Sequence, residues 1–175
     1  MYPTAYEQYD KKTMARVIAK DVSLSTKQCI EICAQLRNKQ IQKAKTFLEQ
    51  VLEMKQAVPF RRFTNGIGHK PGMSAGSYPQ NAAKEILLLL NSLEANAQQK
   101  GLNATNLFIA HISANRAPKA YHYGRKSGRR MKRTHLEIIV AEQSSAPAKA
   151  QKEKTKKERM PNAKEQAKPE LKVQQ

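Results

Sequence analysis

The sequence has no long hydrophobic run. Its longest uninterrupted aliphatic stretch covers residues 86–90, whereas a helix needs roughly 20 apolar residues to cross a bilayer. The first ten residues also lack a basic leader and an apolar core of the length that a secretory signal needs. We therefore expect no membrane span and no export.

Cysteine is scarce as well. The chain has two cysteines, Cys29 and Cys33, which are too few for a disulfide framework and lack a second pair of metal ligands. Because they lie four residues apart on the apolar face of a predicted helix, we interpret them as small buried hydrophobic residues in a reducing compartment. The four histidines fall on different predicted elements, and we predict neither a metal site nor a cofactor.

Acidic residues are few relative to basic ones. The chain has 14 Asp and Glu against 32 Lys and Arg, a formal net charge of +18. A charge of this size attracts a polyanion, either nucleic acid or an anionic membrane surface. The helical acids, such as Glu31, Glu49, Glu53 and Glu94, are predicted to lie on exposed helix faces without clustering. Since no paired carboxylates or activated nucleophile stand out, we do not expect an enzyme.

The remaining composition fits one modest domain, because the chain has 175 residues and 39% hydrophobic content. Apolar residues at a period of two or at helical spacing predict six elements. These are a strand at 14–22, helices that begin at Ser25, Ile41 and Pro79, and strands at 105–115 and 135–140 that should pair antiparallel. Ser25 and Gln28 fit a capping box, Pro59 should force the chain out of the second helix, and Gly101 should end the third. We place the domain at 14–142, after an N-terminal arm at 1–13.

Residues 58–79, here called the glycine-rich loop, contain four of the seven glycines and no acid. An irregular stretch of this length in a small domain is usually functional. Its candidate RNA-binding residues are Arg61, Arg62, His69, Lys70 and Tyr78. The sequence at 65–70 superficially resembles a phosphate-binding glycine loop, but it lacks the required spacing. We interpret its glycines as residues that allow tight turns.

Residues 116–133, here called the basic segment, hold eight basic residues and no carboxylate between two predicted strands. Such a segment cannot pack into a core. If the flanking strands extend into it, about 9 residues per arm at about 3.3 Å each would project on the order of 30 Å. Cations there would release counterions on binding phosphates, and tyrosines could stack on unpaired bases. The candidate residues are Arg116, Lys119, Tyr121, Tyr123, Arg125, Lys126, Arg129, Arg130, Lys132 and Arg133.

Beyond Glu142 the composition shifts to Ala, Lys, Glu, Gln and Pro without aromatic residues. This composition is typical of disorder, and we predict a flexible basic tail at 143–175. Its nine basic and four acidic residues fit either a solubilising extension or a chain that follows a phosphate surface. Both interpretations stay open.

Several short sequences, taken in order and spacing, resemble one known family. They are Val58-Pro-Phe60, Asn65-Gly-Ile-Gly-His-Lys70, Ala75-Gly-Ser-Tyr-Pro79, Asn96-Ala97, Lys100-Gly-Leu102, His111-Ile112, and Gly124-Arg125 eleven residues before His135-Leu-Glu-Ile-Ile-Val140. The family is the universal large-subunit ribosomal protein twenty-two, in its archaeal and eukaryotic branch, and the resemblance covers about residues 14–141. In the basic segment, many relatives have a Pro-Arg-Ala stretch where this chain has residues 120–123, Ala-Tyr-His-Tyr.

The resemblance implies an α+β domain of three helices packed on a three-stranded antiparallel sheet, with a long protruding β-hairpin at about 112–136. It also implies a structural constituent of the large ribosomal subunit in the cytoplasm. By this resemblance the hairpin would thread into large-subunit ribosomal RNA and line the nascent-peptide exit tunnel, beside neighbouring ribosomal proteins and the nascent peptide. The alternative from composition is a free-standing RNA chaperone or a basic nucleic-acid-compacting protein.

Overall fold

The computed structural model describes residues 6–142. The first five residues of the expected arm and the expected flexible tail at 143–175 therefore lie outside the described residues. Within residues 6–142, no helix combines the length and the apolar character that a membrane span requires.

A three-stranded antiparallel sheet forms one layer. Its strands are β1 (Met14–Val22), β4 (Leu107–Arg116) and β5 (Thr134–Glu142), in the order β1-β5-β4. The register places Ala15 opposite Val140 and Val17 opposite Ile138, so that apolar side chains of both strands share one face. The three strands and the antiparallel pairing of the last two are as the sequence predicts.

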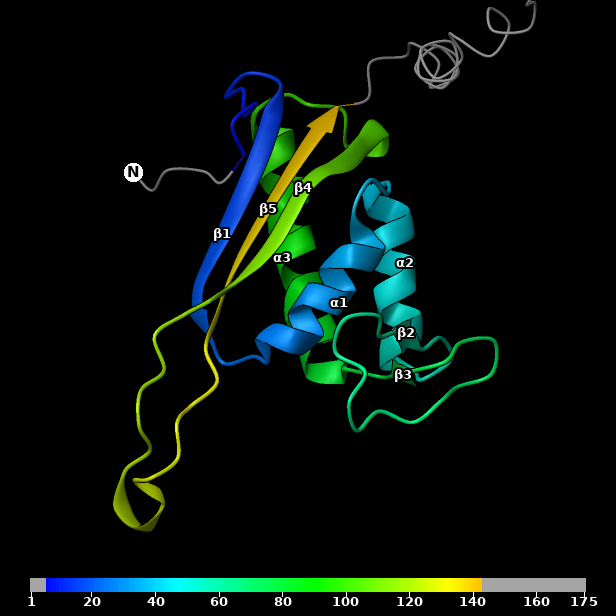
Figure 1. Cartoon of the computed structure of the whole chain (residues 1–175). Helices are drawn as coiled ribbons and strands as arrows, with labels where there is room; N and C mark the ends of the chain where they lie inside the picture. Colours follow the sequence, from blue (N-terminus) through cyan, green and yellow to red (C-terminus); the bar gives the residue numbers. More distant parts are fainter. Residues whose placement is uncertain (1–5, 143–175) are drawn as a thin grey trace, which may run out of the picture. The chain divides into compact units, whose positions relative to one another are not determined.

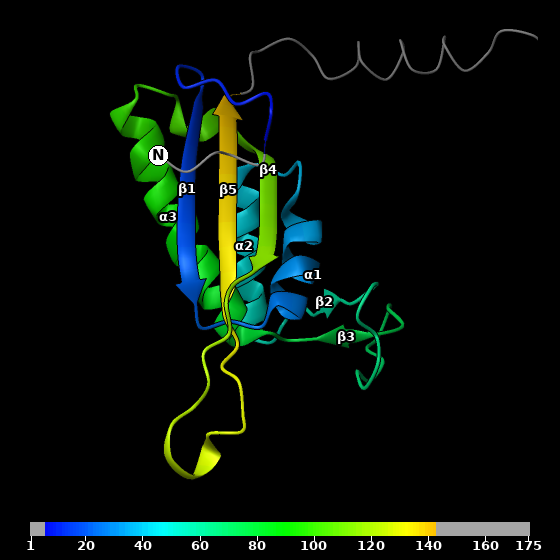
Figure 2. The same ribbon diagram turned by 60° about the vertical axis from the view of Figure 1, so that its left-hand side comes forward.

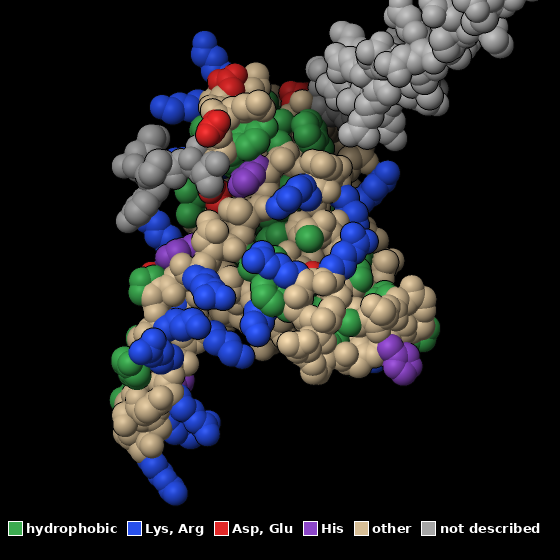
Figure 3. Space-filling view, in the orientation of Figure 1, with side chains coloured by type: hydrophobic (Ala, Val, Ile, Leu, Met, Phe, Trp, Pro, Cys, Tyr) green, Lys and Arg blue, Asp and Glu red, His purple; other side chains and the backbone are tan. Residues whose placement is uncertain are grey.

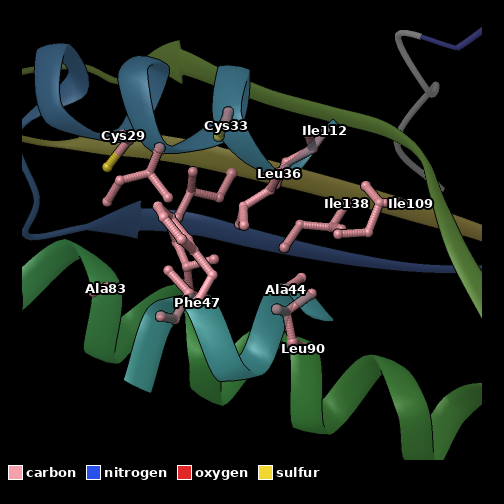
Figure 4. Packing of buried hydrophobic residues seen from close by; sticks show 14 of the residues in the cluster. Cys29, Cys33, Leu36, Ala44, Phe47, Ala83, Leu90, Ile109, Ile112 and Ile138 are labelled. Atoms are coloured by element: carbon pink, nitrogen blue, oxygen red, sulfur yellow. The ribbon is translucent and has the colours of Figure 1, made fainter. Parts of the chain in front are cut away.

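Three helices cover one face of this sheet, as Figures 1 and 2 show. They are α1 (Thr26–Leu36), α2 (Ile41–Leu52) and α3 (Gln80–Gln99). Figure 4 shows apolar side chains from the helices meeting Ile109, Ile112 and Ile138 of the sheet. Each fully buried Leu or Ile contributes roughly 1.5–3 kcal/mol. The predicted α+β fold of three helices on a three-stranded antiparallel sheet is confirmed.

Of the three predicted helix-end signals, only Gly101 acts as predicted. Gly101 adopts a φ of +77°, and its N–H donates to the Gln98 carbonyl while the Leu102 N–H donates to that of Ala97. This pair of bonds is a Schellman motif, which ends α3. α2 ends at Leu52, well before Pro59. Ser25 is the N-cap of α1, but among the described residues its side chain makes no capping hydrogen bond, so the capping-box prediction is wrong.

Residues 6–13 contact β1, β4 and the end of α3. The Tyr6 ring stacks on His111 at 5.4 Å between centroids, and the Arg16 guanidinium lies 5.2 Å from the Tyr9 ring centre. The Lys100 ammonium, next to the end of α3, donates to the carbonyls of Lys11 and Met14 at 3.1 and 2.7 Å. These contacts tie the described part of the arm to the domain.

Candidate nucleic-acid interface

The basic segment is the connection between β4 and β5. The regular ladder between these strands ends at the pair Arg116 and Thr134. Beyond it the two arms are joined by isolated backbone bonds, among them Met131 N–H to the Ala120 carbonyl at 2.8 Å and His122 N–H to that of Arg129 at 2.9 Å. Figures 1 and 2 show the connection projecting beyond the end of the sheet. The flanking strands thus do not extend into the segment as a regular ladder.

The tip of the segment is a turn that presents cations and aromatic rings. A short 3-10 helix, η2, covers Gly124–Lys126, and Gly124 has a φ of +65°, a conformation that favours glycine. The Arg130 guanidinium lies 4.8 Å from the Tyr121 ring centre and donates to its hydroxyl at 2.6 Å. Tyr123 is 87% exposed, so its ring is open to a partner.

The root of the segment is fixed to the domain. Thr134 is fully buried, and its hydroxyl donates to the Leu24 carbonyl at 3.0 Å. Arg133 donates to the Asp21 carbonyl at 3.0 Å, and the Asp21 N–H donates to His135 Nδ1 at 3.2 Å. Asp21 lies at an irregularity of β1 with a φ of +51°. These bonds hold the root of the segment to the domain while its tip projects. This arrangement suits insertion of the tip into a binding partner.

The predicted binding residues of the segment reach solvent. All of them are exposed except Arg133, which is half-buried. No carboxylate within residues 6–142 lies at ion-pair distance from any cation of the segment. Figure 3 shows Lys and Arg side chains along the segment and across the adjacent face of the domain, while the Asp and Glu visible in this view lie mostly toward the opposite end. The positive charge is therefore available to an external anion.

The glycine-rich loop is more ordered than an irregular stretch. Its ends pair as two short strands, β2 (Val58–Pro59) and β3 (Gly76–Ser77), and inside it Lys70 pairs with Met73 across a turn in which Gly72 has a φ of +76°. Of the predicted residues, Arg61, Arg62 and His69 are exposed, while Lys70 and Tyr78 are half-buried. The Lys70 ammonium lies 5.2 Å from the Tyr78 ring centre.

One helical acid lies where the sequence does not predict it. Glu31 is only 3% exposed, so its assignment to an exposed helix face is wrong. Its carboxyl oxygens accept hydrogen bonds from the backbone N–H groups of Arg61, Arg62 and Phe63 at 3.2, 2.8 and 2.9 Å. The glycine-rich loop folds over this face of α1 and buries the carboxyl group. Glu31 thereby fixes the backbone that carries two predicted RNA-binding arginines.

A depression lies between the first turn of α1 and the glycine-rich loop. It has a volume of about 280 Å³. Its walls are Ser25, Lys27, Gln28, Phe60, Arg62, Phe63, Thr64, Asn65, Ile67 and Ser77. The sequence did not predict that Lys27 and Gln28 would line a site. Nothing near them in the sequence indicates contact with a loop that lies more than thirty residues further along the chain.

The two cysteines behave as the sequence predicts. Both are buried and unpaired, and burial raises the pKa of each thiol to about 12. Their interpretation as small buried hydrophobic residues is confirmed. Within residues 6–142 no group of three or more His, Cys, Asp or Glu is arranged to hold a metal ion.

Comparison with known proteins identifies the family. The profile described as "Ribosomal protein L22p/L17e" matches residues 17–141. A relative from Archaeoglobus fulgidus, named large ribosomal subunit protein uL22, is 38% identical over 146 residues, which cover 78% of this chain and 93% of the relative. Proteins of the same name from Methanococcoides burtonii and Methanopyrus kandleri are 37% and 35% identical, over 77% and 81% of this chain and 93% and 94% of their own lengths. The chain therefore belongs to the ribosomal protein L22p/L17e family.

Proposed function

We propose that this protein is a structural constituent of the large ribosomal subunit, where it binds and stabilises large-subunit ribosomal RNA. The observation that carries the proposal is the basic segment, which projects from a fixed root and exposes its cations without carboxylate partners among the described residues. The names of its relatives, large ribosomal subunit proteins, support the same assignment. Its site of action is then the cytoplasmic ribosome.

In the proposed mechanism, the basic segment enters the folded RNA and its cations neutralise the charge of the phosphates. Folded RNA brings phosphates of different helices close together, and their repulsion opposes compaction. Cations inserted between them release condensed counterions, and each neutralised phosphate adds roughly 0.7–0.9 to the slope of log affinity against log salt. Arginine, which supplies five of the eight cations in the segment, can also bind a phosphate with two parallel hydrogen bonds.

The glycine-rich loop supplies a second contact on the domain. Its exposed Arg61, Arg62 and His69 stand on a backbone held by Glu31, so they meet RNA from a defined surface. Lys70 and Tyr78 form a cation–π pair beside them. This contact orients the domain while the basic segment enters the RNA.

At the tip, the segment reaches the wall of the nascent-peptide exit tunnel, beside a neighbouring ribosomal protein. The turn at Gly124–Lys126 leaves Tyr121 and Tyr123 exposed. Aromatic rings with a polar end can contact either an unpaired base or a passing peptide. The role is structural, and no catalytic step is assigned to the chain.

The RNA-binding mechanism is tested by replacing Arg125, Lys126, Arg129 and Arg130 with Ala in the full chain. Affinity for a large-subunit ribosomal RNA fragment should fall, and the salt slope should flatten by up to about 3. The free energy of unfolding should stay unchanged, because these side chains are exposed. Filter binding over a salt series and denaturant titration measure the two quantities.

The matched control removes the same charge elsewhere, by replacing the exposed Lys12, Lys43, Lys55 and Lys84 with Ala. It should flatten the slope far less. An equal effect of both quartets would mean that charge alone governs binding, as in a basic nucleic-acid-compacting protein, and would contradict insertion of the basic segment. A large loss of folding stability in the tip quartet would place those residues in the core.

A further inference from the structure

We propose that the depression between α1 and the glycine-rich loop is a binding site for a single unpaired nucleotide of RNA. This inference rests on the proposed RNA-binding function and adds a shaped site on the domain, separate from the basic segment. Phe63 supplies the stacking surface, Lys27 and Arg62 contact the phosphate, and the amides of Gln28 and Asn65 contact the edge of the base.

The size and lining of the depression favour this ligand. At about 280 Å³ it lies just below the range of roughly 300–1,000 Å³ typical of small-molecule sites, so it has room for one nucleotide and not for a duplex. Two cations and no acid line it. An anionic ligand with a flat apolar part matches a wall that combines cations with phenylalanine.

Phe63 is the centre of the site. Its ring is half-buried, with the Lys27 ammonium at 5.6 Å and the Arg62 guanidinium at 5.4 Å from its centre. Both distances are near the outer limit of about 6 Å for a cation–π contact, and both cations are exposed. They can therefore turn from the ring to a phosphate while a base stacks on the ring, with stacking worth about 5- to 150-fold in affinity.

Two side-chain amides add hydrogen-bonding capacity. Gln28 lines the depression from α1, and Asn65 lines it from the glycine-rich loop. Neither amide makes a side-chain hydrogen bond within the part of the chain that the structure describes. An amide both donates and accepts, as the edge of a nucleobase does, so the pair can replace the water that an unpaired base loses on entering the site.

Glu31 acts as the positioning residue of this site. Its carboxyl group accepts three consecutive backbone N–H groups, including those of Arg62 and Phe63. The side chains of these two residues start from that fixed backbone and line the depression. The wall is therefore set before the ligand arrives, which reduces the entropy lost on binding.

The proposal is tested by titrating the isotope-labelled full chain with adenosine or uridine 5′-monophosphate and following amide chemical shifts. The shifts should concentrate at 25–28 and 60–67. Inorganic phosphate at the same concentration should bind more weakly, because it offers no base. Replacing Phe63 with Leu should raise the Kd at least about 5-fold. Replacing the half-buried Phe108 of β4 with Leu is the matched control and should leave it unchanged.

Lys27→Gln provides a variant that does not disturb the core, since Lys27 is exposed. It should weaken binding of the monophosphate but not of the nucleoside. A single-stranded RNA of ten nucleotides should displace the monophosphate from the site. The proposal is overturned if phosphate alone gives the same shifts, if only the basic segment responds, or if the RNA fails to displace the nucleotide. In those cases the salt-dependent RNA binding of the basic segment would remain, so the two proposals fail separately.

Discussion

At the scale of single residues, Glu31 links the interior of the domain to the surface proposed to meet RNA. An acid on a helix face is ordinarily solvated, yet this carboxyl group is covered by the glycine-rich loop and accepts three backbone hydrogen bonds. Bonds to such a group are stronger than those between neutral partners. One side chain thereby orders a loop that carries two exposed arginines.

Replacing Glu31 with Gln should lower the free energy of unfolding by about 1–3 kcal/mol, because the amide N–H₂ would face a backbone donor and leave it unsatisfied. RNA affinity should fall as well, through disorder of residues 61–63. Denaturant titration and filter binding measure these effects. Glu49→Gln, on the exposed face of α2, is the control and should change neither quantity. An unchanged stability in the Glu31 variant would show that the three bonds contribute nothing.

The cysteines give a prediction that depends on pH. Because burial raises the pKa of both thiols to about 12, against an ordinary value near 8.5, almost no thiolate exists in the folded chain at pH 8. A thiol reagent should therefore react with neither cysteine until the chain unfolds, and then with both. The stabilisation from keeping them protonated is complete below about pH 8.5 and declines as the pH rises toward 12. Rapid labelling of the native chain at pH 8 would contradict the burial.

At the scale of elements, the basic segment and the sheet that carries it are separable. The ladder of β4 and β5 closes at Arg116 and Thr134, and the core cluster contains no residue between them. The root bonds of Thr134 and Arg133 hold the direction of the segment. Its conformation beyond the root is maintained by isolated backbone bonds and by the contact between Tyr121 and Arg130.

Replacing residues 117–133 with Asn-Gly, a two-residue hairpin turn, should leave the domain folded. The free energy of unfolding should stay within about 1 kcal/mol of the parent value, because a shorter connection costs less entropy and few packed atoms are lost. RNA affinity should drop steeply. Denaturant titration with circular dichroism checks the first expectation. A variant that fails to fold would mean that the segment is part of the folding unit.

The helices and strands were largely predictable from sequence, because the patterns that indicate them involve residues close together in the chain. Strand alternation and helical spacing depend on neighbours, so β1, the three helices, β4 and β5 could be anticipated, as could the stop at Gly101. The small ladder of Val58–Pro59 with Gly76–Ser77 was missed, because Gly and Pro in the sequence suggest only irregular structure. The capping box failed because a fitting sequence does not ensure the hydrogen bond.

The candidate interface was predictable in part, for the same reason. Absence of acid over eighteen residues is a local property, so the basic segment could be recognised from composition. The burial of Glu31 and the approach of Lys27 to Phe63 join positions more than thirty residues apart. Such contacts depend on how the glycine-rich loop folds back on α1, which no short window of sequence contains.

At the scale of the whole molecule, the proposed binding mode combines a fixed domain with two surfaces for anionic ligands, the basic segment and the depression beside the glycine-rich loop. The net charge of +18 would promote binding to any polyanion. The fixed root and tip turn of the basic segment, together with the ordered glycine-rich loop, give this charge a defined geometry. A protein that only compacts nucleic acid by its charge does not need such a geometry. A binding surface of defined shape implies one specific binding location, and the family indicates that this location is in the large ribosomal subunit.

Sedimentation of a native lysate tests whether the chain is a constituent of the large ribosomal subunit. The fractions of a sucrose gradient are probed for the chain and for large-subunit ribosomal RNA. If it is such a constituent, nearly all of the chain should sediment with the large subunit and with assembled ribosomes. It should leave them only at high salt, since counterion release makes the binding salt-dependent. Recovery of the chain mostly as free protein, or bound to DNA, would contradict this assignment.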